Sequence, residues 1–142
     1  KVDNYVYDAT AALGCPGGPA GNNACGVPNG DPTGNFGVCN SDGGTVGKDI
    51  VFYYYATLGG FLTVDTQGSS FDTIIYLKSG CNPNCAPPSD CLACNDDHNF
   101  TTGSWSRVYR YPVVANTLYY VVVDGYGTAE GNVQLNVAFS TI

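Results

Sequence analysis

The sequence predicts an all-β protein, either an antiparallel β-sandwich or a jelly roll. Several segments are rich in β-branched and aromatic residues or alternate apolar and polar side chains, as strands with one buried face do. Gly, Asn, Asp, Ser or Pro mark most of the breaks, and apolar residues never recur at helical spacing over more than two turns. The 142 residues suffice for one hydrophobic core, so we expect a single domain spanning residues 1–142.

The expected strands follow one another after Lys48. They cover residues 49–57, 59–68, 71–80, 104–112, 116–125 and 131–140. The second alternates, with Leu62 and Val64 on one face and Thr63 and Asp65 on the other. The segment "NTLYYVVVDG" is apolar on both faces, which predicts a central strand.

The last expected strand alternates as cleanly as the second. Its apolar set is Val133, Leu135, Val137 and Phe139, and its other face carries Gln134, Asn136 and Ala138. Residues 4–13 form either a further strand or a short turn and strand. Tyr53, Tyr54 and Tyr55 must place their rings on both faces of a strand, so most tyrosines belong to the core and some could form a flat binding face for sugar or protein.

Residues 14–48 interrupt this pattern with an irregular, Gly/Pro-rich insertion. Cys15, Cys25 and Cys39 lie within it, and disulfides there would staple a segment that cannot pack by itself. A disordered linker is the alternative interpretation, which the three cysteines make less favourable.

Composition indicates an exported protein. Seven cysteines with few lysines and no methionine favour an oxidising compartment, and a chain beginning at Lys1 suggests that a leader has been removed. We therefore expect an extracellular or cell-surface location. The net charge of -7 disfavours nucleic acid, and no apolar run reaches the about 18 residues that a membrane-spanning helix needs. Because seven is odd, one thiol is left over or pairs between chains.

Four cysteines cluster in "CNPNCAPPSDCLAC", residues 81–94. A hairpin closed by Cys81–Cys94, with Cys85–Cys91 nested inside it, is the favoured interpretation in an oxidising compartment. A four-thiolate zinc site is the alternative.

Acidic and amide side chains stand near the ends of the expected strands. They are Asp72, Asn95, Asp96, Asp97 and Asp124. Hard oxygen ligands gathered in loops suit calcium, and a cation would relieve the repulsion between the adjacent carboxylates of Asp96 and Asp97. The alternative is that aspartates simply favour turns.

Signs of catalysis are weak. His98 is the chain's one histidine and Glu130 its one glutamate, and no nucleophile elbow, HExxH motif or phosphate loop occurs. We therefore expect no enzyme. The triplet "NFT" makes Asn99 a possible N-glycosylation site.

The order of the segments resembles the bacterial pre-peptidase C-terminal (PPC) domain family over residues 49–139. The resemblance is carried by the Ser-x-Asp-Thr step at residues 70–73, by "NDD" at residues 95–97 and by "YYVVVDGY" at residues 119–126. It implies a β-sandwich or jelly roll of secreted bacterial and archaeal proteins, which is often non-catalytic. Relatives in collagenases bind calcium and the substrate fibre.

The family's acidic loop falls on Asn95, Asp96 and Asp97, and its strand-end acids on Asp72 and Asp124. The chain departs from the family in two ways. Many relatives carry a cysteine where Tyr5 or Val6 stands here, so the resemblance implies that Cys39 lacks its usual partner, and the insertion with Cys15 and Cys25 is not typical.

Two functions follow from these expectations. The first is a calcium-stabilised extracellular structural subunit that self-associates through its first dozen residues or its Gly/Pro-rich loop into a fibre, sheath or surface layer. The second is a secreted module that binds polysaccharide or an extracellular protein.

Overall fold

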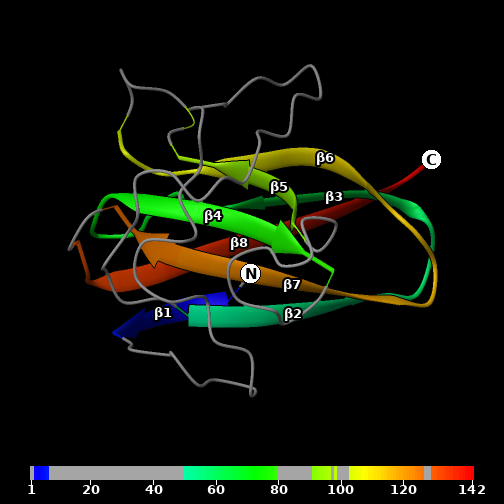
Figure 1. The fold of residues 1–142 in the computed structure, drawn as a ribbon, viewed down its shortest axis with the longest axis horizontal. Coiled ribbons are helices and arrows are strands. Elements are labelled where there is room, and N and C mark those ends of the chain that lie inside the picture. The colour runs from blue at the N-terminus through cyan, green and yellow to red at the C-terminus, as the bar shows by residue number, and fades with distance from the viewer. Residues whose placement is uncertain (1, 7–49, 80–90, 97, 99–102, 127–128) are drawn as a thin grey trace.

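The computed structural model describes residues 2–6, 50–79, 91–96, 98, 103–126 and 129–142. These residues form eight strands and no helix (Figure 1). The strands are β1 (Val2–Val6), β2 (Ile50–Ala56), β3 (Gly60–Asp65), β4 (Thr73–Lys78), β5 (Cys91–Asn95), β6 (Arg107–Val113), β7 (Thr117–Gly125) and β8 (Asn132–Thr141). The predicted insertion at 14–48 lies outside the described residues.

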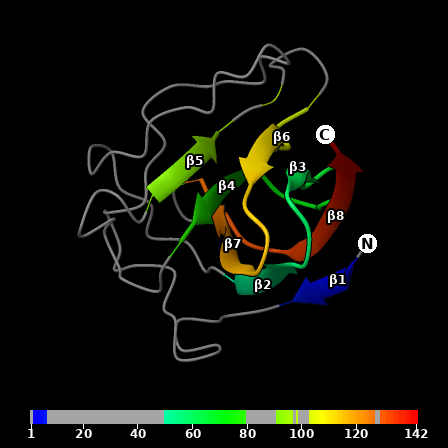
Figure 2. The ribbon, with the colours of Figure 1, turned by 90° about the vertical axis from the view of Figure 1, so that its right-hand side faces the viewer.

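The strands make two antiparallel four-stranded sheets, ordered β1-β8-β3-β6 and β2-β7-β4-β5. Figure 2 shows the two sheets facing each other. One apolar core draws on both sheets, including Leu62, Val64, Ile75, Leu77, Val121, Val123 and Leu135. The all-β prediction is therefore confirmed.

The predicted alternation of β3 is confirmed, because Leu62 and Val64 are fully buried while Thr63 and Asp65 are half-buried. In β8 the alternation fades toward the end of the strand. Val133 and Leu135 are buried, but Phe139 is 36% exposed.

The sheet β2-β7-β4-β5 is buried on one face and over part of the other. Its face away from the other sheet carries a second cluster of buried residues: Val51, Ile74, Tyr76, Cys94 and Val122. Lys78 of β4 is also buried, with 1% of its surface exposed. The prediction that residues 116–125 form a central strand is confirmed, since β7 lies between β2 and β4.

One strand begins later than expected. A strand was expected to begin at Ser104, but β6 begins at Arg107, because Ser104 and Ser106 bond outside the strand ladders. Within the expected hairpin at 81–94, the described strand β5 pairs with β4, where Cys94 lies opposite Tyr76. The sequence left open whether the start of the chain forms a strand or a turn and strand. The structure has the strand β1 there, which pairs with β8. The described residues contain no helix that is long and apolar enough to cross a membrane.

Candidate functional site

Three of the predicted acidic residues, Asp72, Asp96 and Asp124, stand near one end of the β2-β7-β4-β5 sheet. Asp124 of β7 lies opposite Ile74 of β4, and Asn95 of β5 lies opposite Ile75. The next residue after Asn95, Asp96, therefore follows at the level of Ile74 on the other side of β4. Neighbouring strands stand about 4.8 Å apart, so Asp124 and Asp96 flank β4 with backbones on the order of 10 Å apart.

Asp72 stands at the same end. It precedes Ile74 by two residues, and the N–H of Tyr126 donates to its carbonyl at 3.0 Å, which extends the β4–β7 pairing. Asp124 is 3% exposed, and its Oδ1 accepts from the N–H of Gly125 at 2.8 Å.

Asn95 connects the two sheets. Its side chain is fully buried, and its Oδ1 accepts a hydrogen bond from the backbone N–H of Arg107 at 2.8 Å. This bond ties the end of β5 to the start of β6 in the other sheet. The predicted role of Asn95 as a metal ligand stays a prediction.

Two further residues of the predicted sites, Asp97 and Asn99, lie outside the described residues. Within the described ranges, no three His, Cys, Asp or Glu side chains gather closely enough to hold a metal ion.

The cysteine predictions also fall largely outside the described residues. Cys94 is buried and disulfide-bonded. Cys81 and Cys85 lie outside the description, as does the side chain of Cys91. The nested pairing therefore stays a prediction.

A buried network of hydroxyl groups, which the sequence analysis missed, closes the same end of the sandwich. The hydroxyls of Thr66 and Thr73 lie 2.6 Å apart, and the N–H of Ser106 donates to Thr66 Oγ1 at 2.8 Å. Ser106 Oγ donates to the carbonyl of Thr73 and also contacts that of Asp96. The network connects the ends of β3 and β5 to the starts of β4 and β6.

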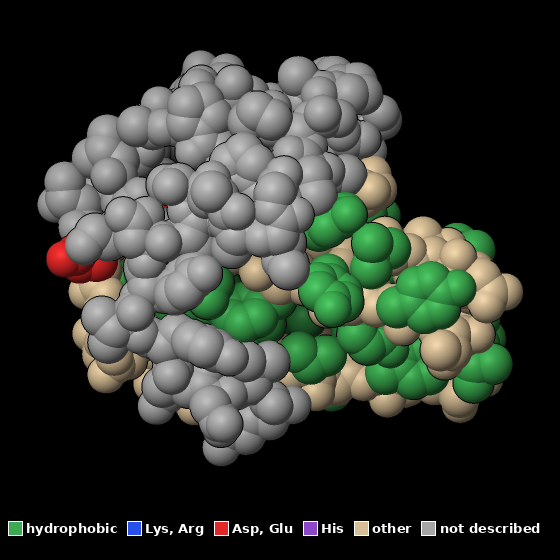
Figure 3. Space-filling model, turned by 90° about the horizontal axis from the view of Figure 1, so that it is seen from below, with side chains coloured by type: hydrophobic (Ala, Val, Ile, Leu, Met, Phe, Trp, Pro, Cys, Tyr) green, Lys and Arg blue, Asp and Glu red, His purple; other side chains and the backbone are tan. Residues whose placement is uncertain are grey.

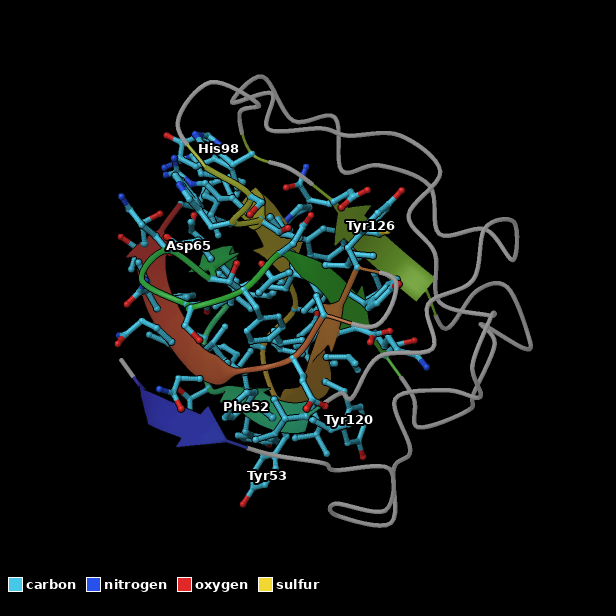
Figure 4. All side chains as sticks on the ribbon, turned by 90° about the vertical axis from the view of Figure 1, so that its left-hand side faces the viewer. Phe52, Tyr53, Asp65, His98, Tyr120 and Tyr126 are labelled. Atoms are coloured by element: carbon cyan, nitrogen blue, oxygen red, sulfur yellow. The ribbon has the colours of Figure 1, made fainter. Side chains whose placement is uncertain are left out.

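His98 and Trp105 stack beside this network, with ring centroids 4.2 Å apart. The N–H of His98 donates to the carbonyl of Trp105 at 2.8 Å, which fixes the two segments together. Burial lowers the pKa of His98 below its ordinary value, and nearby Arg107 acts in the same direction while Asp65 opposes them. Figure 4 looks onto this end, where His98 and Asp65 lie on one side and Tyr126 on the other.

The opposite end of the sandwich is apolar at its surface. Tyr53 and Tyr55 of β2 are 61% and 52% exposed, and Leu118 of β7 lies opposite Tyr55. Leu58 and Val114, in the turns after β2 and β6, are 59% and 66% exposed. Figure 3 shows hydrophobic side chains gathered on this side, with no charged side chain visible among them.

The strand β1 occupies only part of an edge. It pairs with β8 over Asn132–Leu135, in a register interrupted between Val2 and Tyr5. The other edge of β8 pairs with β3, over residues 136–141. In the described part of the chain, residues 136–141 have no partner strand on the side of β1.

Comparison with known proteins gives no matching family model, no matching curated protein and no matching solved structure. The similarity to PPC domains therefore rests on the sequence motifs alone.

Proposed function

We propose that this protein is a non-catalytic extracellular structural subunit that polymerises by exchanging β1 between copies. The observation that carries the proposal is the pairing of β1, which among the described strands pairs with β8 alone, along one edge of the sheet. In the polymer, β1 of one copy would take the same place on β8 of the next.

Strand exchange of this kind needs little new chemistry. The backbone hydrogen bonds that β1 makes within one copy are the bonds it would make in the next, so exchange between identical chains is a low-cost route to assembly. Residues 7–49 separate β1 from β2, and a long connection adds little entropic cost to the exchange. The contact is head-to-tail, so it builds filaments unless its rotation happens to close a ring.

The apolar end supports a second contact between copies. A chain of net charge -7 repels its own copies, so a stable contact requires a surface without acidic groups. Tyr53, Tyr55 and Leu118 form such an uncharged surface on β2 and β7. A second copy of the chain carries the same negative charge, so it is the partner that requires a contact surface without acidic groups.

Calcium binding at the acidic end is part of the proposal. Asp124 lies near the end of β7, Asp72 directly precedes β4 and Asp96 directly follows β5, so their backbones stand near one end of the sheet, and Asp97 follows Asp96 in the sequence. Carboxylates are the ligands that calcium prefers, and the ion would neutralise the repulsion among them. The ion would stabilise the fold without taking part in a reaction.

The finer expectations remain proposals of the same kind. They comprise jelly-roll connectivity, secretion, disulfides that staple the Gly/Pro-rich loop, the nested bridges Cys81–Cys94 and Cys85–Cys91, and glycosylation at Asn99.

The experiment compares Tyr5→Pro with Tyr5→Thr in the full chain. Proline removes the backbone N–H and disfavours a ladder position, whereas threonine keeps the backbone and suits a strand. In light scattering and electron microscopy with calcium present, we expect filaments from the parent and Tyr5→Thr but not from Tyr5→Pro.

Two outcomes would contradict the proposal in different ways. If the parent chain stays monomeric at high concentration with calcium, the structural function is wrong. If Tyr5→Pro assembles as well as Tyr5→Thr, the polymer stands but β1 does not build it.

A further inference from the structure

A pocket of about 360 Å³ opens at the acidic end of the sandwich, between the turn that joins β3 to β4 and the segment before β6. Its lining includes two aromatic rings, three hydroxyls and one carboxylate, those of Phe71, Trp105, Ser69, Ser70, Ser104 and Asp72. This volume falls in the range of small-ligand sites. The pocket therefore offers both ring surfaces and hydrogen-bonding groups to one ligand.

The serine walls of the pocket are held by backbone hydrogen bonds. The carbonyl of Ser104 accepts from the N–H of Thr73 at 3.0 Å. Ser70 and Asn132 are joined twice, because the N–H of Ser70 donates to the carbonyl of Asn132 at 3.0 Å and Ser70 Oγ accepts from the N–H of Asn132 at 2.8 Å. Walls that are already fixed lower the entropic cost of binding a ligand.

The indole wall is held as firmly. Trp105 is oriented by its stacking on the ring of His98 and by the hydrogen bond that its carbonyl accepts from the backbone N–H of His98. Gly103, at a φ of 125°, lies beside the same ring, and a side chain there would come within 3.4 Å of Trp105 Cδ1. The glycine therefore leaves this edge of the indole uncovered.

These groups select a class of ligand. An anion would be repelled by Asp72 and by the net charge of -7, and a purely apolar ligand would remove water from the carboxylate and hydroxyls without offering them a hydrogen bond. A sugar ring has a C–H face that packs on an aromatic ring and hydroxyls that bond to carboxylate and serine. We propose that this pocket binds a neutral hexose unit of a polysaccharide, with its C–H face on Trp105 and its hydroxyls on Asp72 and Ser70. The binding is independent of polymerisation.

The chain offers a direct readout of this pocket, because Trp105 is its only tryptophan. We would titrate the full chain with maltohexaose, cellohexaose and mannohexaose and follow indole fluorescence, with calcium and with EGTA. We expect a saturable change with at least one of these sugars. A polygalacturonate oligomer, which is anionic, should bind at least tenfold more weakly.

Variants then locate the ligand, with affinity measured by calorimetry and folding checked by the unfolding midpoint. Trp105→Ala should weaken binding at least tenfold. Ser104→Tyr fills the pocket from an exposed position, so it should weaken binding similarly while the chain stays folded. Tyr55→Ala, at the opposite end, is the matched aromatic control and should bind as the parent does.

The proposal is overturned if none of the three neutral sugars gives a saturable change. It is equally overturned if folded Ser104→Tyr binds as tightly as the parent. Loss of binding in Tyr55→Ala but not in Ser104→Tyr would place the sugar on the tyrosines of β2 instead.

Discussion

The hydroxyl of Thr66 is central to the buried network because it contacts three groups. It lies 2.6 Å from the hydroxyl of Thr73 and 3.3 Å from the carbonyl oxygen of Ser106. It also accepts a hydrogen bond from the backbone N–H of Ser106 at 2.8 Å. Thr66→Val keeps the shape of the side chain but leaves that buried N–H without its acceptor. We expect the free energy of unfolding to fall by about 1–3 kcal/mol.

Urea unfolding of Thr66→Val measures this loss. Thr141→Val makes the same chemical change at an exposed position at the end of β8, and it should stay within about 0.5 kcal/mol of the parent. Equal stability of the two variants would mean that the network contributes nothing.

Tyr111 predicts how stability changes at alkaline pH. Burial raises the pKa of its hydroxyl above the ordinary value of 10.0, and Tyr119 raises it further. The unfolded chain therefore loses this proton first, so the contribution of Tyr111 is fully present below about pH 10 and declines as the pH rises above it. We expect the loss of stability between pH 9 and pH 11 to be smaller in Tyr111→Phe than in the parent. Identical losses in urea unfolding would show that Tyr111 does not contribute.

At the scale of elements, two adjacent glycines test how closely β3 approaches β8. A Cβ at Gly60 would meet the backbone carbonyl of Ser140 and come within 2.6 Å of the ring of Phe139, whereas one at Gly59 would have its closest contact at 3.6 Å. We expect Gly60→Ala to cost about 1–3 kcal/mol, because the strands must move apart. Gly59→Ala should be close to neutral. The two unfolding midpoints decide this, and equal midpoints would contradict the close approach.

The elements that the sequence predicted well are those whose side-chain pattern depends on one strand alone. The alternation of residues 60–65 and the two-faced apolar character of residues 117–125 both survive in the fold. The strand β5 was harder to predict, since Cys91–Asn95 is short and its cysteines suggested a local hairpin. The site was predictable only in part. The aspartates stand at strand ends, but the hydrogen bond of Asn95 and the approach of Thr66 to Ser106 depend on segments about 12 and 40 residues apart in the sequence.

Calcium should stabilise the whole molecule through the acidic end. An ion held at 100 times its dissociation constant adds about 2.7 kcal/mol to the free energy of unfolding. We expect the thermal midpoint of the parent to be higher in calcium than in EGTA, and this difference to disappear in Asp124→Asn. Asp65→Asn, which changes an acid in the other sheet, should keep it. An equal calcium effect in both variants would remove Asp124 from the site.

The two ends of the molecule differ in charge, and this difference predicts how salt acts on assembly. Four acidic residues, Asp65, Asp72, Asp96 and Asp124, stand at one end of the molecule, whereas the exposed apolar side chains at the other end carry no charge. Repulsion between copies of net charge -7 therefore opposes assembly, and no ion pair across the apolar contact offsets it. The Debye length falls from about 30 Å at 0.01 M salt to about 8 Å at 0.15 M, so added salt screens this repulsion.

We expect the protein concentration at which filaments appear in light scattering to fall as the NaCl concentration rises. If the acidic end binds calcium, this protein concentration should be lower still in CaCl₂ at the same ionic strength. Tyr55→Lys puts a charge into the apolar surface and should raise that concentration, whereas Tyr55→Phe should leave it nearly unchanged. Filaments that dissolve as NaCl rises would show that charge pairs hold the copies together. In that case the contact would not lie on the apolar surface, because the residues that form that surface carry no charge.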